Sequence, residues 1–195
     1  LVDTTFFNSQ YGYVDVLDMD GDGDTDVLKV PFSNGNSDPL TWNENKSKGS
    51  EWEKHSIITS VGSINWMQSS WGDLDGDGDL DLAVPEIDFI NMPSQASLYW
   101  LENKGNDDWA KHPLLNGTFL YSSIADLDGD GDLDIACDED SIGVLWLENQ
   151  LSGSAWNQHP VIDNDDFHLL GACVDFNGDG AADIVSSMAT GGMAY

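Results

Sequence analysis

The stretch "DMDGDGDTDVL", residues 18–28, decides the fold, because it places an aspartate at every second position and then turns apolar. The same line recurs as "DLDGDGDLDLA" from Asp73, as "DLDGDGDLDIA" from Asp126 and as "DFNGDGAADIV" from Asp175. The copies start about 50 residues apart, a period typical of propellers, solenoids and other repeat arrays. The first nine residues of each copy are called Asp loops 1 to 4 below.

The composition indicates a folded and strongly acidic protein. The chain has 195 residues, 40% of them hydrophobic, with 8 Trp, which is enough to bury a core. Its formal net charge is −30, so self-repulsion opposes folding unless something neutralises it, and nucleic acid and anionic membranes are excluded as partners. No apolar run approaches the ~20 residues of a membrane span, so we expect no membrane insertion. The chain begins without Met or a signal peptide, and we expect a mature or trimmed product.

The Asp loops have the chemistry of a cation site. They hold half of the 36 acidic residues, and like charges at that density raise one another's pKa unless a cation is bound. Oxygen-bearing side chains stand at positions 1, 3, 5 and 9, a backbone carbonyl at position 7 adds a ligand, and Gly at position 6 permits a sharp turn. The predicted ligand residues are Asp18, Asp20, Asp22, Asp24 and Asp26; Asp73, Asp75, Asp77, Asp79 and Asp81; Asp126, Asp128, Asp130, Asp132 and Asp134; and Asp175, Asn177, Asp179, Ala181 and Asp183.

Calcium is the predicted ion, with up to four Ca²⁺, one in each loop. Ca²⁺ takes six to eight oxygen ligands, whereas Mg²⁺ keeps its waters and takes few protein ligands. Loop 4 has Asn177 and Ala181 where the other loops have Asp, so we predict that it is the weakest site.

Two other calcium motifs do not match. The EF-hand loop closes with Glu at position 12, where this chain has Lys29, Val84, Cys137 and Ser186, and each Asp loop runs into a short apolar stretch typical of a strand. Tandem nonapeptide calcium helices repeat about every nine residues, not every fifty.

A second signature lies between the Asp loops. It reads "TWNEN", "YWLEN" and "LWLEN", each followed by a turn and then by "WEKH", "WAKH" and "WNQH". This pattern is typical of a β-hairpin. Because they recur once per unit, we interpret the histidines as packed structural rings and the glutamates as turn-stabilising residues: His55, His112 and His159, and Glu44, Glu102 and Glu148. His168 stands outside the repeat.

One unit therefore reads as strand, Asp loop, strand, strand, turn and strand, with no helical periodicity. Four strands in about 50 residues predict an all-β fold of four-stranded antiparallel propeller blades. The predicted units form one repeat domain, with repeat 1 at 1–56, repeat 2 at 57–113, repeat 3 at 114–160 and an incomplete repeat 4 at 161–195.

The Asp loops resemble those of the FG-GAP and VCBS repeat families, best known from the propeller of integrin α chains. The Trp-x-Glu-Asn and Trp-x-x-His elements resemble bacterial and fungal members. The resemblance implies calcium bound by loop positions 1, 3, 5, 7 and 9, an extracellular or cell-surface location, and a role in adhesion, in carbohydrate-active proteins or as a scaffold.

The predicted units amount to about three and a half blades, since the last unit stops at "GGMAY", where its hairpin should begin. Three explanations remain open: a fragment of a larger propeller, completion of the edge by another chain, or end-to-end assembly of copies through open β edges.

The leading functional hypothesis is a non-catalytic, calcium-stabilised scaffold that binds a protein or glycan ligand or further copies of itself. Trp66, Trp71 and Tyr121 are candidate glycan contacts, although we expect most of them in the blade core. The alternative is a portion of a carbohydrate-active enzyme, similar to a polysaccharide lyase or a sugar dehydratase, but no catalytic constellation is legible.

Two further features are the cysteines and the glycosylation sequons. Cys137 and Cys173 match no zinc or redox spacing, and either pair as a disulfide between adjacent units or remain buried free thiols. The sequons at Asn45 and Asn116 would permit N-glycosylation.

Overall fold

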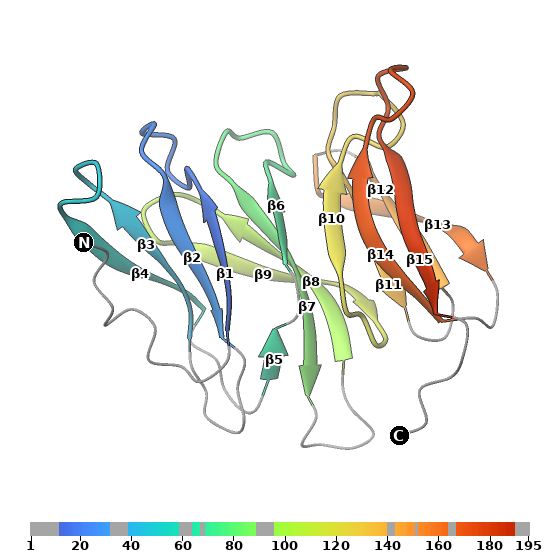
Figure 1. Ribbon diagram of the computed structural model, residues 1–195, viewed down its shortest axis with the longest axis horizontal. Coiled ribbons are helices and arrows are strands. Elements are labelled where there is room, and N and C mark those ends of the chain that lie inside the picture. The colour runs from blue at the N-terminus through green and yellow to red at the C-terminus, as the bar shows by residue number, and fades with distance from the viewer. Residues whose placement is uncertain are drawn as a thin grey trace.

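The computed structural model describes residues 12–31, 39–58, 64–66, 69–88, 96–139, 143–150, 152–163 and 167–189. Within these residues every regular element is a β-strand, and the strands form antiparallel sheets that stand side by side without closing into a ring (Figure 1). This confirms the predicted all-β, propeller-type architecture.

Blades 1 and 3 are four-stranded sheets in which each strand pairs with the next in the chain. Blade 1 consists of β1 (Gly12–Leu17), β2 (Asp26–Pro31), β3 (Leu40–Asn45) and β4 (Trp52–Ile58). Blade 3 consists of β10 (Ser122–Ala125), β11 (Asp134–Glu139), β12 (Gly143–Gln150) and β13 (Ala155–Asp163). The strands after each Asp loop and both strands of each hairpin lie where the sequence predicted them.

Blade 2 differs at its inner edge, where the sequence predicted one continuous strand. The structure has two short strands there, both paired with β7. Its elements are β5 (Ile64–Trp66), β6 (Ser70–Gly72), β7 (Asp81–Asp88), β8 (Ala96–Asn103) and β9 (Trp109–Asn116). Trp66 pairs with Glu86 and Ser70 with Ala83, so the inner edge has one residue more than its partner and the register shifts.

The last two strands form a separate pair, β14 (Phe167–Val174) and β15 (Asp183–Ala189). Three blades and this pair agree with the predicted three and a half blades. The predicted start of the first strand at 6–11 and the segment "GGMAY" at 191–195 lie outside the described residues.

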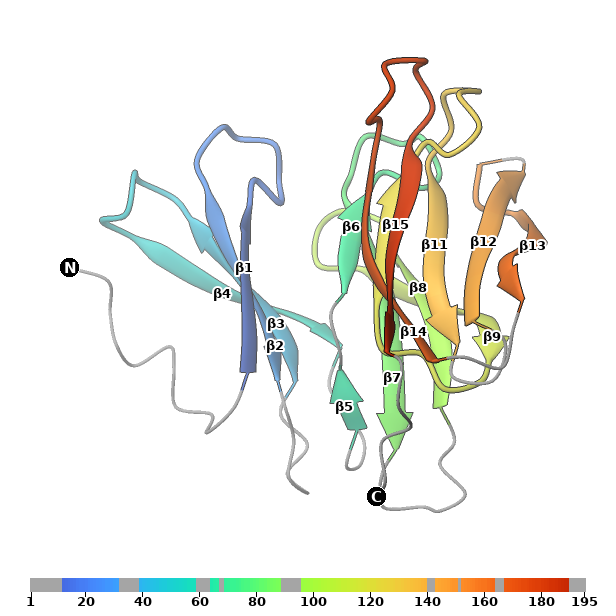
Figure 2. The same ribbon diagram turned by 45° about the vertical axis from the view of Figure 1, so that its right-hand side comes forward.

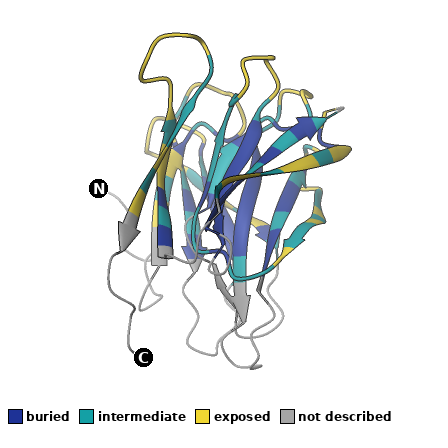
Figure 3. Ribbon diagram, turned by 90° about the vertical axis from the view of Figure 1, so that its right-hand side faces the viewer, coloured by how far each residue is buried: buried dark blue, intermediate teal, exposed yellow. Residues whose placement is uncertain are grey.

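The core lies between neighbouring blades. One cluster joins Leu28 and Val30 of blade 1 to Leu82 of blade 2, and a second joins blade 2 to blade 3. A third, smaller cluster joins blade 3 to β14 and β15. Figure 3 shows the buried residues concentrated in the sheets and the exposed ones in the loops. Because each blade buries its faces only against its neighbours, the molecule is stabilised as a stack of repeats.

The inner strands of blades 2 and 3 approach closely. A Cβ on Gly72 of β6 would lie 2.7 Å from Ile124 and 2.8 Å from Leu133, so a side chain does not fit there. Nearby, the Ser122 hydroxyl donates to the Ala83 carbonyl at 3.0 Å. This packing fixes the blades in one orientation, with all four Asp loops on the same edge of the molecule (Figures 1 and 2).

Candidate metal-binding loops and the hairpins that hold them

Each Asp loop is curled by bonds from its own backbone to its first aspartate. In loop 2, the Asp73 carboxylate accepts the N–H groups of Gly76 at 2.8 Å and Gly78 at 3.0 Å. Asp126 and Asp175 accept the two corresponding bonds in loops 3 and 4. The first aspartate therefore serves as the hub around which the loop turns.

Two glycines give the loop the backbone conformation that this curl requires. Gly76 has φ of 80° and Gly78 has φ of 99°, in the left-handed region that residues with a Cβ rarely adopt. The sequence predicted this role for the sixth position, and the structure shows it for the fourth as well. The N–H of Asp77, which lies between the two glycines, donates to the Asp75 side chain at 3.1 Å and forms an Asx turn that tightens the loop further.

The ninth position carries an aspartate whose two oxygens are both held by backbone. Asp81, the first residue of β7, accepts the N–H groups of Leu74 at 2.9 Å and Asn103 at 2.8 Å. Asp26 and Asp134 each accept the equivalent pair of bonds at 2.7–3.0 Å. All three aspartates are at most 1% exposed. A carboxylate can be buried here because these bonds replace its hydration.

The last Asn of each Trp-x-Glu-Asn motif connects the Asp loop to the hairpin turn. The Asn103 amide donates to the Leu80 carbonyl in loop 2 at 3.4 Å, and its Oδ1 accepts the Gly105 N–H in the turn at 3.1 Å. Asn45 bridges loop 1 and its own turn in the same way, through Thr25 and Gly49. The sequence showed the motif but not this role, because the partners are backbone groups that become neighbours only in the folded blade.

Asn149 extends the same connection across two blades. Its amide donates to the Leu133 carbonyl of loop 3 at 3.0 Å and to the Leu74 carbonyl of loop 2 at 2.7 Å. Its Oδ1 accepts the Gly153 N–H at 2.7 Å. Loops 2 and 3 are therefore tied to one side chain, and the order of one loop supports the other.

The carboxylates of loops 1 to 3 gather closely enough to share an ion. In each of the following trios the ligand atoms lie within 4.8 Å of one another: Asp18, Asp20 and Asp22; Asp73, Asp75 and Asp81; Asp126, Asp128 and Asp134. Because Ca–O distances are about 2.3–2.6 Å, two ligands of one ion are at most about 5 Å apart. Asp18 Oδ1 is buried and has no hydrogen-bond partner among the described residues, as expected of an oxygen that serves as a cation ligand. The residues present fit a hard, oxygen-binding metal ion.

Other predicted ligands lie outside these trios. They are Asp26, Asp77 and Asp130, the residues of loop 4, and the position-7 residues Asp24, Asp79, Asp132 and Ala181, whose predicted ligand is the carbonyl. The Asp24 side chain instead accepts the Lys48 N–H of the neighbouring turn at 3.1 Å. The predicted assignment of these residues as ligands stays a prediction.

Burial raises the pKa of several loop carboxylates. Desolvation raises the pKa of Asp81 to about 6, although the N–H groups of Asn103 and Leu74 act against it. The same cause raises the pKa of four others: Asp20, Asp26, Asp75 and Asp134. Negative charge is therefore costly at these positions, and a cation that neutralises it would stabilise the fold.

Asp loop 4 keeps the curl but not the surroundings. Asp183 accepts the Phe176 N–H at 3.0 Å and is only half-buried. Its other close neighbour is the Asn177 amide at 3.5 Å, where loops 1 to 3 have the backbone of a motif asparagine. In contrast to the buried sites, the pKa of Asp175 is lowered by the N–H groups of Gly178 and Gly180.

The repeated histidines and glutamates pair with each other across the hairpins. His112 Nε2 bonds Glu102 at 2.7 Å and its ring stacks on Trp100 with centroids 4.6 Å apart. The other two units repeat both contacts. The structural interpretation of these histidines agrees with this packing. One detail differs from the prediction, because the rings cover a tryptophan rather than a loop. The glutamates bind the rings, and Glu44 and Glu102 also pair with Lys46 and Lys104 at the start of the turns.

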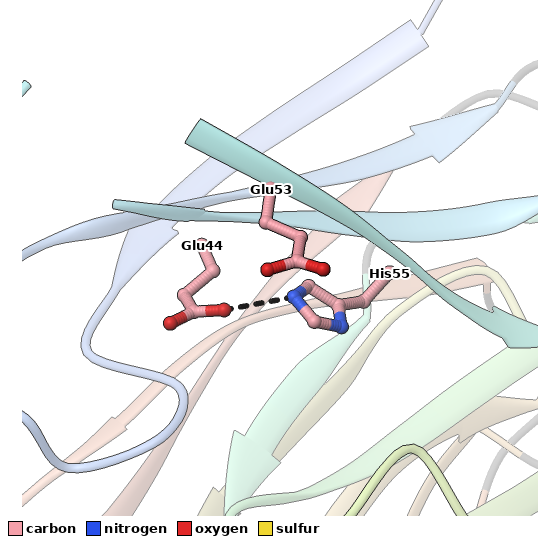
Figure 4. Close-up of side chains that lie close together, drawn as sticks. All are labelled: Glu44, Glu53 and His55. Carbon is pink, nitrogen blue, oxygen red and sulfur yellow. Dashed lines mark hydrogen bonds and ion pairs between the residues drawn. The ribbon is translucent and has the colours of Figure 1, made fainter. Parts of the chain in front are cut away.

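Unit 1 adds a cluster that the sequence analysis did not recognise. Glu44, Glu53 and His55 have ligand atoms within 4.8 Å of one another (Figure 4). Lys46 bridges Glu44 and Glu53, and His55 Nδ1 also bonds Asp107 of the next blade at 2.8 Å. Burial lowers the pKa of His55, but the bonds to Asp107 and Glu44 outweigh it and the net direction is upward. The sequence feature that could have indicated this cluster is Glu53, which pairs with Glu44 across the hairpin. The equivalent positions in units 2 and 3 hold Ala110 and Asn157.

The remaining candidates have simple outcomes. Cys137 and Cys173 are free thiols, the first buried and the second half-buried. Asn45 is buried and uses its amide within the blade, so a glycan there would break that contact, whereas Asn116 is exposed. Among the predicted glycan contacts, Trp71 and Tyr121 pack against the cores, and the side chain of Trp66 lies outside the described part.

Antiparallel blades of this kind, each with an Asp loop tied to a Trp-x-Glu-Asn hairpin, define a propeller-type repeat protein. Residues 18–84 match the family model for the FG-GAP-like repeat, which confirms the predicted resemblance to FG-GAP repeats over this segment. The comparison with curated proteins finds no match. None of the described elements is a helix that could cross a membrane.

Proposed function

We propose that the chain is an extracellular calcium-binding module that acts as a non-catalytic scaffold for recognition or assembly. The observation that carries the proposal is the repeated connection from carboxylate trio to Asp81, from Asp81 to Asn103, and from Asn103 to the hairpin turn. An ion bound in the loop would act through this connection on the outer half of the blade.

Calcium is favoured by the ligand chemistry. The loops offer many carboxylate oxygens on a curled backbone, which suits a cation with six to eight ligands better than Mg²⁺. Each Ca²⁺ would also offset two of the 30 excess negative charges. Extracellular modules bind calcium with dissociation constants of about 10⁻⁴ to 10⁻³ M, which matches sites that are partly open to solvent.

Calorimetric titration and thermal unfolding test this proposal on the whole chain. A site saturated 100-fold above its Kd contributes about 2.7 kcal/mol, so several sites should raise Tm by roughly 10 °C or more. Asp128→Asn in loop 3 should reduce this gain, and Asp108→Asn, at an exposed position outside the loops, serves as the matched control. A Tm that does not respond to chelation would overturn the proposal.

Self-assembly is the second candidate, because apolar side chains are exposed on the last part of the molecule. Phe176 is 69% exposed, Val174 44% and Val185 40%. Such surface is typical of an interaction site, here for a further blade or a second copy. Sedimentation velocity in calcium and after chelation separates the two candidates, since a monomer under both conditions contradicts assembly.

A further inference from the structure

The motif asparagine of blade 3 makes a contact that its two counterparts do not make. Asn45 and Asn103 each donate from the side-chain amide to a carbonyl of their own Asp loop, at 3.1 and 3.4 Å. The Asn149 amide donates to Leu133 of its own loop at 3.0 Å and also to Leu74 of loop 2 at 2.7 Å. Among the described residues, no hydrogen bond joins loop 1 to loop 2.

Both acceptors of Asn149 lie next to carboxylates that could hold an ion. Leu74 stands between two members of the loop 2 trio, and Leu133 directly precedes Asp134 of the loop 3 trio. Because each peptide unit is a rigid plane, a carbonyl cannot shift without moving the residues on both sides of it. The arrangement of each trio therefore affects the bond that its loop makes with Asn149.

Loops 3 and 4 are also in direct contact. The Ala182 N–H of loop 4 donates to the carbonyl of Asp126, a member of the loop 3 trio, at 2.7 Å. A Cβ on Gly129 would lie 3.7 Å from the Ala181 side chain, an ordinary contact distance. Both views show these two loops side by side, before β11 and β15 (Figures 1 and 2). Loops 2, 3 and 4 thus form a bonded row, and loop 1 stands outside it.

We propose that loops 2, 3 and 4 bind calcium as a coupled group, in which Asn149 transmits the coupling between loops 2 and 3 and the bond from Ala182 to Asp126 extends it to loop 4. Loop 1 binds independently. The inference deepens the proposed calcium-binding function and rests on it.

The coupling is positive because closure of one loop prepares the next. Without a cation, the carboxylates of each trio repel one another and oppose the closed curl. A cation that holds the loop 3 trio closed also fixes the Leu133 carbonyl and, through Asn149, the Leu74 carbonyl of loop 2. Less conformational entropy is then lost when loop 2 closes around its own ion.

Charge alone would act in the opposite direction. A cation in one loop weakens the negative potential that attracts a second cation to its neighbour. At 0.15 M salt the Debye length is about 8 Å, so this effect is screened between exposed loops. It also requires no hydrogen bond, and it acts on both neighbours of loop 2, loops 1 and 3. The two effects therefore differ in sign and in their dependence on Asn149.

The test is a calcium titration of the whole chain at about 0.15 M salt, followed by NMR at one glycine N–H in each loop. Asp128→Ala removes an exposed member of the loop 3 trio. We expect loop 2 to lose about fivefold in affinity, loop 4 to weaken as well, and loop 1 to keep its Kd. Because coupling is reciprocal, Asp75→Ala should weaken loop 3 by the same factor. Each reporter glycine donates to the first aspartate of its own loop: Gly23, Gly78, Gly131 and Gly180.

Substitutions of Asn149 separate coupling from a purely structural role. Asn149→Asp keeps the oxygen that accepts the Gly153 N–H but loses both amide donors, and Asn149→Ala repeats the measurement without the added charge. In either background, Asp128→Ala should leave the Kd of loop 2 unchanged. A purely structural asparagine would weaken loop 2 but keep the fivefold ratio. Asn45→Asp is the matched control, because its amide serves loop 1, and there the fivefold effect should persist.

Three results would overturn the coupling of loops 2 and 3: a loop 2 affinity that Asp128→Ala leaves unchanged or increases, a fivefold ratio that persists in folded Asn149→Asp and Asn149→Ala, or a loop 1 that weakens as much as loop 2. A loop 4 that keeps its affinity would overturn the extension through Ala182. Calcium binding itself is measured by whether the glycine signals shift at all. Loops that bind calcium independently contradict only this inference, whereas a chain without calcium-dependent shifts contradicts the proposed function as well.

Discussion

Asp loops 2 and 4 have similar sequences, DLDGDGDLD and DFNGDGAAD, and nearly the same curl, but they differ in what surrounds them. In loop 2 the ninth residue, Asp81, is fully buried and bound by the backbone of Asn103. In loop 4 the ninth residue, Asp183, is half-buried, and its second hydrogen-bond partner is the Asn177 amide of the same loop. The comparison teaches that the nine residues specify the curl, whereas the hairpin asparagine couples the loop to the blade.

The largest expected effect comes from removing the ninth aspartate. Asp81→Ala leaves two buried N–H groups unpaired, each of which costs about 1–3 kcal/mol, so we expect a loss of roughly 3 kcal/mol even after the charge is relieved. Asp183→Ala should cost less than about 1 kcal/mol, since its site is open to water. Urea unfolding in calcium-free buffer measures both, and equal losses would contradict the difference between the loops.

A smaller effect is expected for the asparagines. Asn149→Ala removes an amide that bonds two carbonyls and an oxygen that holds the turn, at a cost of about 2 kcal/mol. The control is Asn177→Ala in loop 4, an exposed position where we expect a change within about 0.5 kcal/mol. If Asn149→Ala unfolds at the same urea concentration as the unsubstituted chain, the side chain does not couple loop and turn.

The sequence predicted the curl and the hairpins but not their connection. Alternating Asp and Gly at fixed positions identify a turn locally, and the Trp-x-Glu-Asn motif identifies a strand end. The bond from Asn103 to Asp81 joins residues 22 apart, and the bond from Asn149 to Leu74 joins residues 75 apart. Such pairs depend on how blades stack. The same applies to the contact between His55 and Asp107, which joins two neighbouring blades.

The charge of the third loop position gives a prediction about ion affinity. Loop 2 has Asp75 there and loop 4 has Asn177, and ligand charge tunes calcium affinity. Asn177→Asp should strengthen the weakest site about tenfold, which corresponds to ~1.4 kcal/mol. Asp75→Asn should weaken loop 2 by a similar factor. Calcium titration followed by calorimetry or NMR measures both, and a loop 4 that binds as tightly as loop 2 before substitution would refute the predicted ranking.

The smallest effect concerns pH. The pKa of Asp81 is raised from 3.8 to about 6 by burial, so in calcium-free protein its contribution to stability is present below pH 4 and is lost as the pH rises through 6. The pKa of Asp175 in loop 4 is lowered, so its contribution is present above the unfolded value and is lost as the pH falls. Because calcium binds the deprotonated carboxylates, the Tm difference between calcium-loaded and calcium-free protein should widen from pH 4.5 to 7.5.

Most of this widening should come from the buried loops, because they carry the raised carboxyl groups. Asp81→Asn should therefore flatten the pH dependence of the Tm difference, whereas Asp183→Asn in loop 4 should leave most of it. Thermal unfolding of both variants across this pH range measures the effect. If the Tm difference of the unsubstituted chain is constant with pH, burial of the ninth aspartate does not determine how much calcium stabilises the fold. The stabilisation would then come from the curled backbone that all four loops share.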